Sequence, residues 1–238
     1  PWLGHVAGRF GGMEYPELAG AGVLDAKGWP QRMPRKLGSI GTLVLTDMPE
    51  AATALKGRYV LRFEGRGTIE VTGRARNIRY GQNEVRFDYA PGPGSVDIRI
   101  QRINSSDPPR NITVMREAHV AAYDAGAVFN PDLLAHLRGV KLLRFMDWMM
   151  TNDSPIATWE DRPRVSDVTY ALRGVPLPVM LALANELQAD PWFNMPHLAD
   201  GDHMRNFAQA VKAGLDPALT AHVEFSNEVW NWQFAQTR

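Results

Sequence analysis

The dipeptide Asn227-Glu228 is the feature of this sequence with the clearest chemical meaning. It follows a run of largely apolar residues that we expect to form a buried strand, and it is followed by Trp230 and Trp232. A carboxyl group can donate a proton, an amide can hold a hydroxyl group, and an indole face can stack on a sugar ring. Cleavage of a glycosidic bond uses these three kinds of group together.

Polar and aromatic residues also follow two earlier segments that we expect to be strands. We predict that Glu228 and Asn227 are catalytic, and Arg144 is a further polar candidate at an earlier strand end. We predict that seven contact the substrate: Asp147, Trp148, Asn152, Trp192, Asn194, His197 and Trp230. The expected ligand is a polysaccharide or oligosaccharide.

Each of these assignments has a simpler alternative. Asn227 and Glu228 could begin the next helix, where an amide cap and an early acidic residue are stabilising. Arg144 and Asp147 could form an ion pair at a strand end. A lone histidine such as His197 is more often structural, and large aromatic side chains usually lie in the core.

The elements that must position these residues lie within 118–238. Strands expected at about 140–148, 190–195 and 221–228 alternate with helices, one of which begins at Asn130-Pro131 with an amide cap and a proline. This alternation predicts a parallel sheet, which we interpret as part of a (β/α)8 barrel. In such barrels the chemistry is found where the strands end.

The preceding half, residues 20–117, has a different pattern. Short alternating apolar runs are separated by glycine and proline, as in Pro91-Gly92-Pro93-Gly94, which predicts an antiparallel β-sandwich. The expected fold class is therefore α/β plus all-β, with a sandwich followed by part of a barrel. Aromatic residues of this half suggest carbohydrate binding, although alternation turns about half of them inward: Trp29, Tyr59, Tyr80 and Tyr89.

Composition narrows the choice of function. Lysine and arginine total 26, as do aspartate and glutamate, so no net field favours nucleic acid or a membrane surface. There is no cysteine, no apolar run long enough to span a bilayer, and no phosphate loop, nucleophile elbow or dinucleotide fingerprint. We expect no cofactor and no metal, since helix capping by Asp202 explains the segment 200–203 better than metal binding does. Neither oligomeric state nor location is indicated, beyond an extracytoplasmic preference that the expected substrate would bring.

The strand that ends in Asn227-Glu228 resembles the fourth strand of the clan of retaining (β/α)8 glycoside hydrolases, which includes cellulases and mannanases. The wider chain is similar to bacterial proteins labelled cellulose-binding proteins. The stretches that carry the second resemblance are 25–30, 57–61, 110–112, 143–152, 189–200 and 224–231. Together they are spread over most of the chain.

The resemblance implies a mechanism. Glu228 would be the general acid and base, Asn227 would hold the sugar 2-hydroxyl, and Arg144 would keep a nucleophilic glutamate ionised. Burial among Trp148, Trp192 and Trp230 would raise the pKa of Glu228. The nucleophile would lie on a seventh strand beyond Arg238, so we expect the chain to be an inactive piece of a longer protein, truncated at both ends. The alternative is a carbohydrate-binding protein without catalysis.

Overall fold

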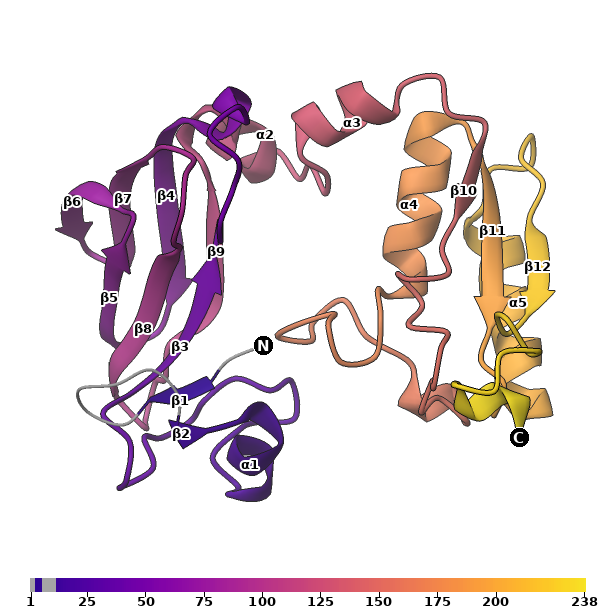
Figure 1. Cartoon of the computed structure of the whole chain (residues 1–238), viewed down its shortest axis with the longest axis horizontal. Coiled ribbons are helices and arrows are strands. Elements are labelled where there is room, and N and C mark those ends of the chain that lie inside the picture. The colour runs from indigo at the N-terminus through magenta and orange to yellow at the C-terminus, as the bar shows by residue number, and fades with distance from the viewer. Residues whose placement is uncertain (1–2, 6–11) are drawn as a thin grey trace. The chain divides into compact units, whose positions relative to one another are not determined.

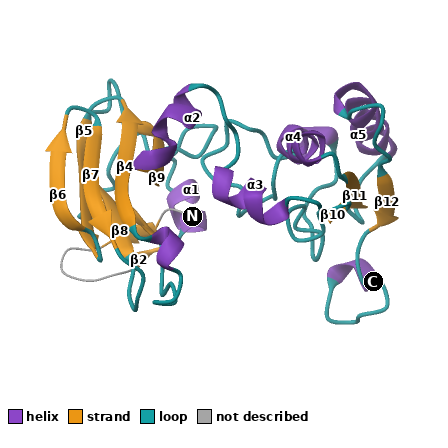
Figure 2. Cartoon of the chain, turned by 90° about the horizontal axis from the view of Figure 1, so that it is seen from above, coloured by secondary structure: helices purple, strands orange, loops and turns teal. Residues whose placement is uncertain are grey.

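The computed structural model describes residues 3–5 and 12–238, which belong to two compact units, Pro1–Ala127 and Val128–Arg238 (Figure 1). Strands dominate the first unit, and helices and strands alternate in the second (Figure 2). Within the described residues, none of the helices combines the length and the apolar character needed to cross a membrane.

The N-terminal unit contains two antiparallel sheets. The first has the order β2-β1-β3-β8-β5, with bounds Gly12–Met13, Leu3–His5, Ser39–Val44, Val96–Ile103 and Gly67–Gly73. The second has the order β6-β7-β4-β9, with bounds Arg76–Gly81, Glu84–Tyr89, Gly57–Glu64 and Arg110–Arg116. Two short helices accompany them, α1 (Tyr15–Gly20) and α2 (Val120–Asp124). The predicted antiparallel sheets are thus present, and the whole chain is mixed sheet and helix as expected.

Alternation along the strands builds the core of this unit. In β7, Val85, Phe87 and Tyr89 are buried, and the residues between them are only partly covered. Phe87 stacks on Tyr59 of the neighbouring β4, with ring centroids 5.6 Å apart. Of the four aromatic residues considered for sugar binding, Trp29, Tyr59 and Tyr89 are therefore core residues, and Tyr80 alone is exposed.

The C-terminal unit contains a parallel three-stranded sheet in the order β10-β11-β12. The bounds are Leu142–Arg144 for β10, Asp190–Met195 for β11 and His222–Phe225 for β12. Its helices are α3 (Pro131–Leu137), α4 (Leu177–Leu187) and α5 (Gly201–Gly214). Figure 2 shows α4 and α5 on the same side of the three strands.

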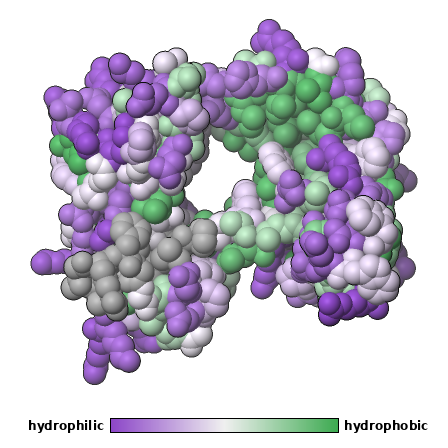
Figure 3. Space-filling model, viewed as in Figure 1, coloured by the Kyte–Doolittle hydropathy of each residue, from purple (hydrophilic) through white to green (hydrophobic). Residues whose placement is uncertain are grey.

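The two faces of this parallel sheet differ in chemistry because side chains alternate along β11. Phe193 and Met195 are buried in one apolar cluster with residues of α4 and α5, among them Met180 and Phe207. Trp192 and Asn194 must point to the opposite face. Figure 3 shows a continuous apolar area over the part of this unit where Figure 1 places α3 and α4.

The caps of two helices were predicted with different success. Asn130 caps α3 as expected, since its side chain accepts a hydrogen bond from Asp132 N at 2.9 Å. The prediction that Asp202 caps α5 is wrong, because Asp200 Oδ1 accepts from His203 N at 2.7 Å. Asp202 lies in the first turn, where it pairs with Arg205.

Two strands are shorter than predicted. The strand expected at 140–148 ends at Arg144, because the chain then turns and Met149 N donates to Phe145 O at 2.8 Å. The strand expected at 221–228 ends at Phe225, and Ser226 and Glu228 have φ angles of 55° and 44°, which no strand residue adopts. The last described element is a single 3-10 turn, Ala235–Thr237.

Candidate functional site

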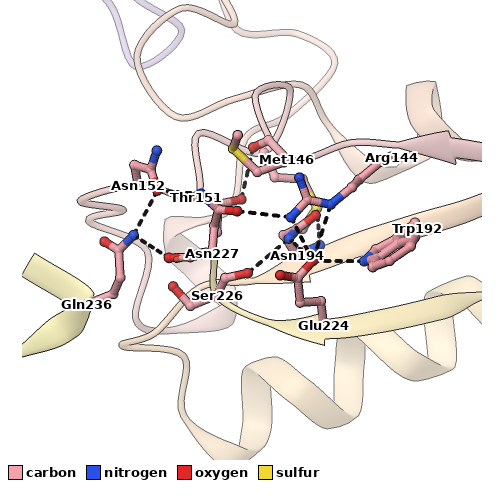
Figure 4. A network of polar contacts seen from close by, with 11 residues as sticks. Arg144, Met146, Thr151, Asn152, Trp192, Asn194, Glu224, Ser226, Asn227 and Gln236 are labelled. Atoms are coloured by element: carbon pink, nitrogen blue, oxygen red, sulfur yellow. Dashed lines mark hydrogen bonds and ion pairs between the residues drawn. The ribbon is translucent and has the colours of Figure 1, made fainter. Parts of the chain in front are cut away.

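A network of polar side chains gathers at the carboxyl ends of β10, β11 and β12 (Figure 4). Its centre is Glu224 Oε2, which accepts hydrogen bonds from Arg144 Nη2 at 2.8 Å, Trp192 Nε1 at 3.0 Å and Asn194 Nδ2 at 2.7 Å. Arg144 Nε lies 3.3 Å from the same oxygen. The register explains the convergence, because Arg144 is paired with Trp192 and Asn194 with Glu224 across the sheet.

The network continues from Arg144 to the loop after β12. Arg144 Nη2 also donates to Asn227 Oδ1 at 2.9 Å. Asn194 Nδ2 donates to Ser226 O at 2.9 Å as well as to Glu224. Because both partners of Asn194 Nδ2 are acceptors, they fix which end of this buried amide is nitrogen and which is oxygen.

A second layer ties Asn227 to the loop after β10 and to the last residues of the chain. Asn152 Oδ1 accepts from Asn227 Nδ2 at 3.1 Å and from Gln236 Nε2 at 2.7 Å. Gln236 Nε2 also donates to Asn227 O, and Gln236 Oε1 accepts from Asp153 N. Asn227 is therefore held from both sides, as a residue that orients a ligand must be.

Glu224 is the ionised carboxylate of this site. Burial alone would raise its pKa, but hydrogen bonds from Arg144 and Asn194, the positive charge of Arg144 and the Trp192 hydrogen bond together outweigh burial and lower the pKa below its ordinary value. At neutral pH the Arg144–Glu224 pair consequently carries no net charge.

Glu228 directly follows Asn227 in the chain. Its carboxylate accepts a hydrogen bond from Asn231 Nδ2 at 3.0 Å, and the Asn231 backbone nitrogen donates to Glu228 O at 2.8 Å. These bonds form a turn, so Asn227 and Glu228 do not begin a helix, which was the simpler alternative. Asn227 connects the two parts of the site, because it is joined to Arg144 through its side chain and to Glu228 through the backbone.

The expected enclosure of Glu228 by three indoles is not found. Trp148 packs against Phe145 in the apolar cluster, and Trp192 donates its N–H to Glu224. Trp230 is 71% exposed and Trp232 is 76% exposed. Trp148 is directed toward the helices because the chain turns just before this residue.

Some of the remaining predicted residues belong to the network, and others do not. Asn152, Trp192 and Asn194 belong to it. Asp147 is exposed and lies outside it, and the ion pair of Arg144 is made with Glu224. His197 follows β11 and is partly buried, and its Nδ1 has no hydrogen-bond partner among the described residues.

Glu224, Ser226 and Gln236 belong to the network and were not predicted. Glu224 had a usable signal, because it is a charged residue inside a strand with apolar neighbours, two positions from His222 on the same face. Ser226 and Gln236 had none, since their roles depend on a left-handed turn and on the return of the chain end to Asn152.

A cavity of about 730 Å³ lies elsewhere in this unit, between α4, α5 and the loop that precedes α4. Its lining is mostly apolar and includes Leu177, Leu181 and Phe207. Because these residues belong to the helix-covered face of the sheet, the cavity is separate from the polar network.

Comparisons of the chain with protein-family models, with curated proteins and with solved structures gave no match.

Proposed function

We propose that the chain is part of a retaining glycoside hydrolase that acts on a β-linked polysaccharide or oligosaccharide, with Glu228 as general acid and base. The observation that supports it most is the hydrogen bond between Arg144 and Asn227, which joins the ends of two strands beside Glu228. A carboxylic acid, an amide and a guanidinium group at one sheet edge are the groups that this chemistry uses.

The parallel sheet supports the further proposal that the unit belongs to a (β/α)8 barrel. One face packs on α4 and α5, and the other bears Arg144, Asn194 and Glu224. A closed barrel requires this division, because its helices cover the outside and its strand ends carry the chemistry on the inside.

In the proposed reaction, a second carboxylate attacks the anomeric carbon while Glu228 gives its proton to the departing glycosidic oxygen. Glu228 then takes a proton from water, whose oxygen displaces the enzyme carboxylate from the sugar. The two carboxyl groups of such enzymes lie about 5–5.5 Å apart. Asn227 would hold the sugar 2-hydroxyl. Nη1 of Arg144, which makes no hydrogen bond within the described network, is left to contact the nucleophile.

The test uses the product of the complete reading frame and measures release of reducing sugar from cellulose, mannan and xylan oligosaccharides. We expect Glu228→Gln to lower kcat at least about 100-fold and to leave binding of the substrate nearly unchanged, because only proton transfer is removed. Glu186→Gln, on the exposed side of α4, is the matched control. Unchanged hydrolysis by Glu228→Gln would exclude the assignment.

The second candidate is a carbohydrate-binding protein without catalysis. The exposed indoles of Trp230 and Trp232 favour it, because stacking platforms serve binding as well as cleavage. Two results would decide for it: retention of the chain on insoluble cellulose that is lost in the Trp230→Ala/Trp232→Ala double variant, and no hydrolysis by the complete protein. Hydrolysis that depends on Glu228 would decide against it.

A further inference from the structure

The two oxygens of the Glu224 carboxylate have different surroundings. Oε2 accepts every hydrogen bond that the described residues donate to this group, from Arg144, Trp192 and Asn194. Oε1 receives none of them. The side chain is 30% exposed, so the group is open to a molecule from solution. An ionised carboxylate with one saturated oxygen has capacity for further donors at the other.

Two neighbouring buried atoms also lack partners. Asn194 Oδ1 and Ser226 Oγ belong to fully buried side chains and have no hydrogen-bond partner among the described residues. Asn194 and Ser226 are neighbours of Glu224, because Asn194 Nδ2 bridges Glu224 Oε2 and the backbone oxygen of Ser226. Leaving a buried polar atom without a partner costs about 1–3 kcal/mol, so such atoms are normally satisfied by water or by a ligand.

The polar atoms that lack a hydrogen-bond partner determine which kind of ligand could bind here. Glu224 Oε1 and Asn194 Oδ1 can only accept hydrogen bonds, so the partner must donate. An anionic ligand is disfavoured by the charge of Glu224, and a cationic ligand by the neighbouring Arg144. Uncharged hydroxyl groups meet both conditions.

We propose that Glu224 and Asn194, with Ser226, form a subsite for the hydroxyl groups of an uncharged sugar, in which Glu224 accepts through Oε1. The identity of the ligand as a saccharide rests on the proposed function. The substrate class is thereby narrowed to neutral sugars, since a uronate carboxylate would meet Glu224.

In this subsite Trp192 positions Glu224 and does not itself stack on the sugar. Its N–H positions Glu224, and the Arg144 guanidinium lies over its ring, 5.5 Å from the centroid. One indole face is therefore occupied by the protein. Stacking on the sugar falls to Trp230 and Trp232, which are the exposed indoles of the loop after β12.

The experiment measures binding to the 238-residue chain by calorimetry. The probes are three neutral hexasaccharides (cello-, manno- and xylohexaose) and hexaglucuronate with the β-1,4 linkage of cellohexaose. We expect at least one neutral probe to bind at least tenfold more tightly than hexaglucuronate. Glu224→Gln should weaken that binding at least tenfold, and the exposed-carboxylate variant Glu186→Gln should leave it unchanged.

A merely structural role of Glu224 is separated by two further measurements. Ser226→Ala removes only a hydroxyl group that has no hydrogen-bond partner among the described residues, so the fold should be kept while the affinity falls severalfold. The affinity of the unsubstituted chain should also decrease in acid as Glu224 takes up a proton, and that of Glu224→Gln should not.

The outcomes distinguish the two proposals. Neutral-sugar binding that survives unchanged in both Glu224→Gln and Ser226→Ala overturns the subsite and leaves the proposed function standing. Equal affinity for hexaglucuronate also overturns the subsite alone. Absence of binding to every probe overturns the subsite, and the hydrolysis assay of Glu228→Gln then decides the proposed function separately.

Discussion

Ion pairs between partly exposed side chains are usually worth less than about 1 kcal/mol, because water screens both charges. The pair of Arg144 and Glu224 differs in that the carboxylate also accepts from Trp192 and Asn194. Each added donor reduces the freedom of Glu224 and orients the guanidinium toward Asn227. The hydrogen bonds of this cluster thus fix side chains whose rotamers would otherwise vary.

The lowered pKa of Glu224 predicts how the stability of the protein depends on pH. A carboxyl group whose pKa is lower in the folded state contributes stability above its unfolded pKa, and this contribution is lost as the pH falls through the folded pKa. At pH 7 we expect Glu224→Gln to reduce the free energy of unfolding by about 1–2 kcal/mol, the value of hydrogen bonds to a charged group discounted for partial exposure.

This difference should shrink as the pH falls below 4.5, the ordinary value for glutamate, and vanish below the folded pKa. Urea unfolding followed by tryptophan fluorescence between neutral and acidic pH measures it, with Glu186→Gln as the control. A loss of stability that is the same at every pH would show that Glu224 acts through packing alone.

The site residues that could be predicted from the sequence are those whose side chains are unusual for their position. Arg144, Asn194 and Asn227 were expected at strand ends and are members of the network. Glu224 was overlooked because Glu228 has the more familiar neighbours, although both carboxylates lie in the same segment. Which of the two meets Arg144 depends on the residue at which the strand stops, and periodicity fixes strand ends poorly.

At the scale of elements, the cap of α5 gives a sharp test. Asp200→Ala should lower the free energy of unfolding by about 1 kcal/mol, because the N–H of His203 loses its acceptor. Asp202→Ala, two residues later, removes an exposed charge of the first turn and its surface ion pair with Arg205, and should cost less than half as much. Thermal unfolding of the two variants compares them directly. Equal losses would mean that the charge of the first turn, and not the cap, stabilises the helix.

Elements with a strong local signal were predictable. Asn130-Pro131 begins α3, and β11 occupies the segment expected for it, because caps, proline and apolar runs act over a few residues. The turn from Phe145 to Thr151 was not predictable in this way. Its residues are as apolar as a buried strand, and only the packing of Trp148 and Met149 against the helices reveals the turn.

At the scale of the whole molecule, β12 is an edge strand of the described sheet and bears exposed apolar side chains. Val223 is 66% exposed and Phe225 is 61% exposed. Unpaired edges of this kind associate with other chains. We expect the 238-residue chain to self-associate at tens of micromolar and above, the range in which exposed strand edges cause aggregation.

Phe225→Lys should restore the monomer, because a charged residue on an edge opposes pairing. Val165→Lys, which replaces an exposed apolar residue on a loop, should leave association unchanged. Sedimentation velocity over a concentration series measures both variants. A chain that remains monomeric without substitution would contradict the prediction.

The fold class could be predicted from the sequence because two patterns extend over many residues. Apolar residues alternate in the first half, and strands alternate with helices in the second. Antiparallel sheets in one unit and mixed sheet and helix in the whole chain follow from them. Barrel closure has no such local signal. It depends on the number of strands and on their tilt, and three parallel strands are compatible with open and closed sheets alike.

The left-handed backbone at Ser226 and Glu228 has a consequence for how this protein can change. Neither residue type favours that conformation, and each residue held there costs on the order of 1 kcal/mol relative to glycine. Selection for heat resistance would therefore favour glycine on both sides of Asn227. Selection for a well-ordered site would oppose glycine, because glycine would make this turn more flexible. Heat resistance and the order of the site therefore favour different residues at these two positions.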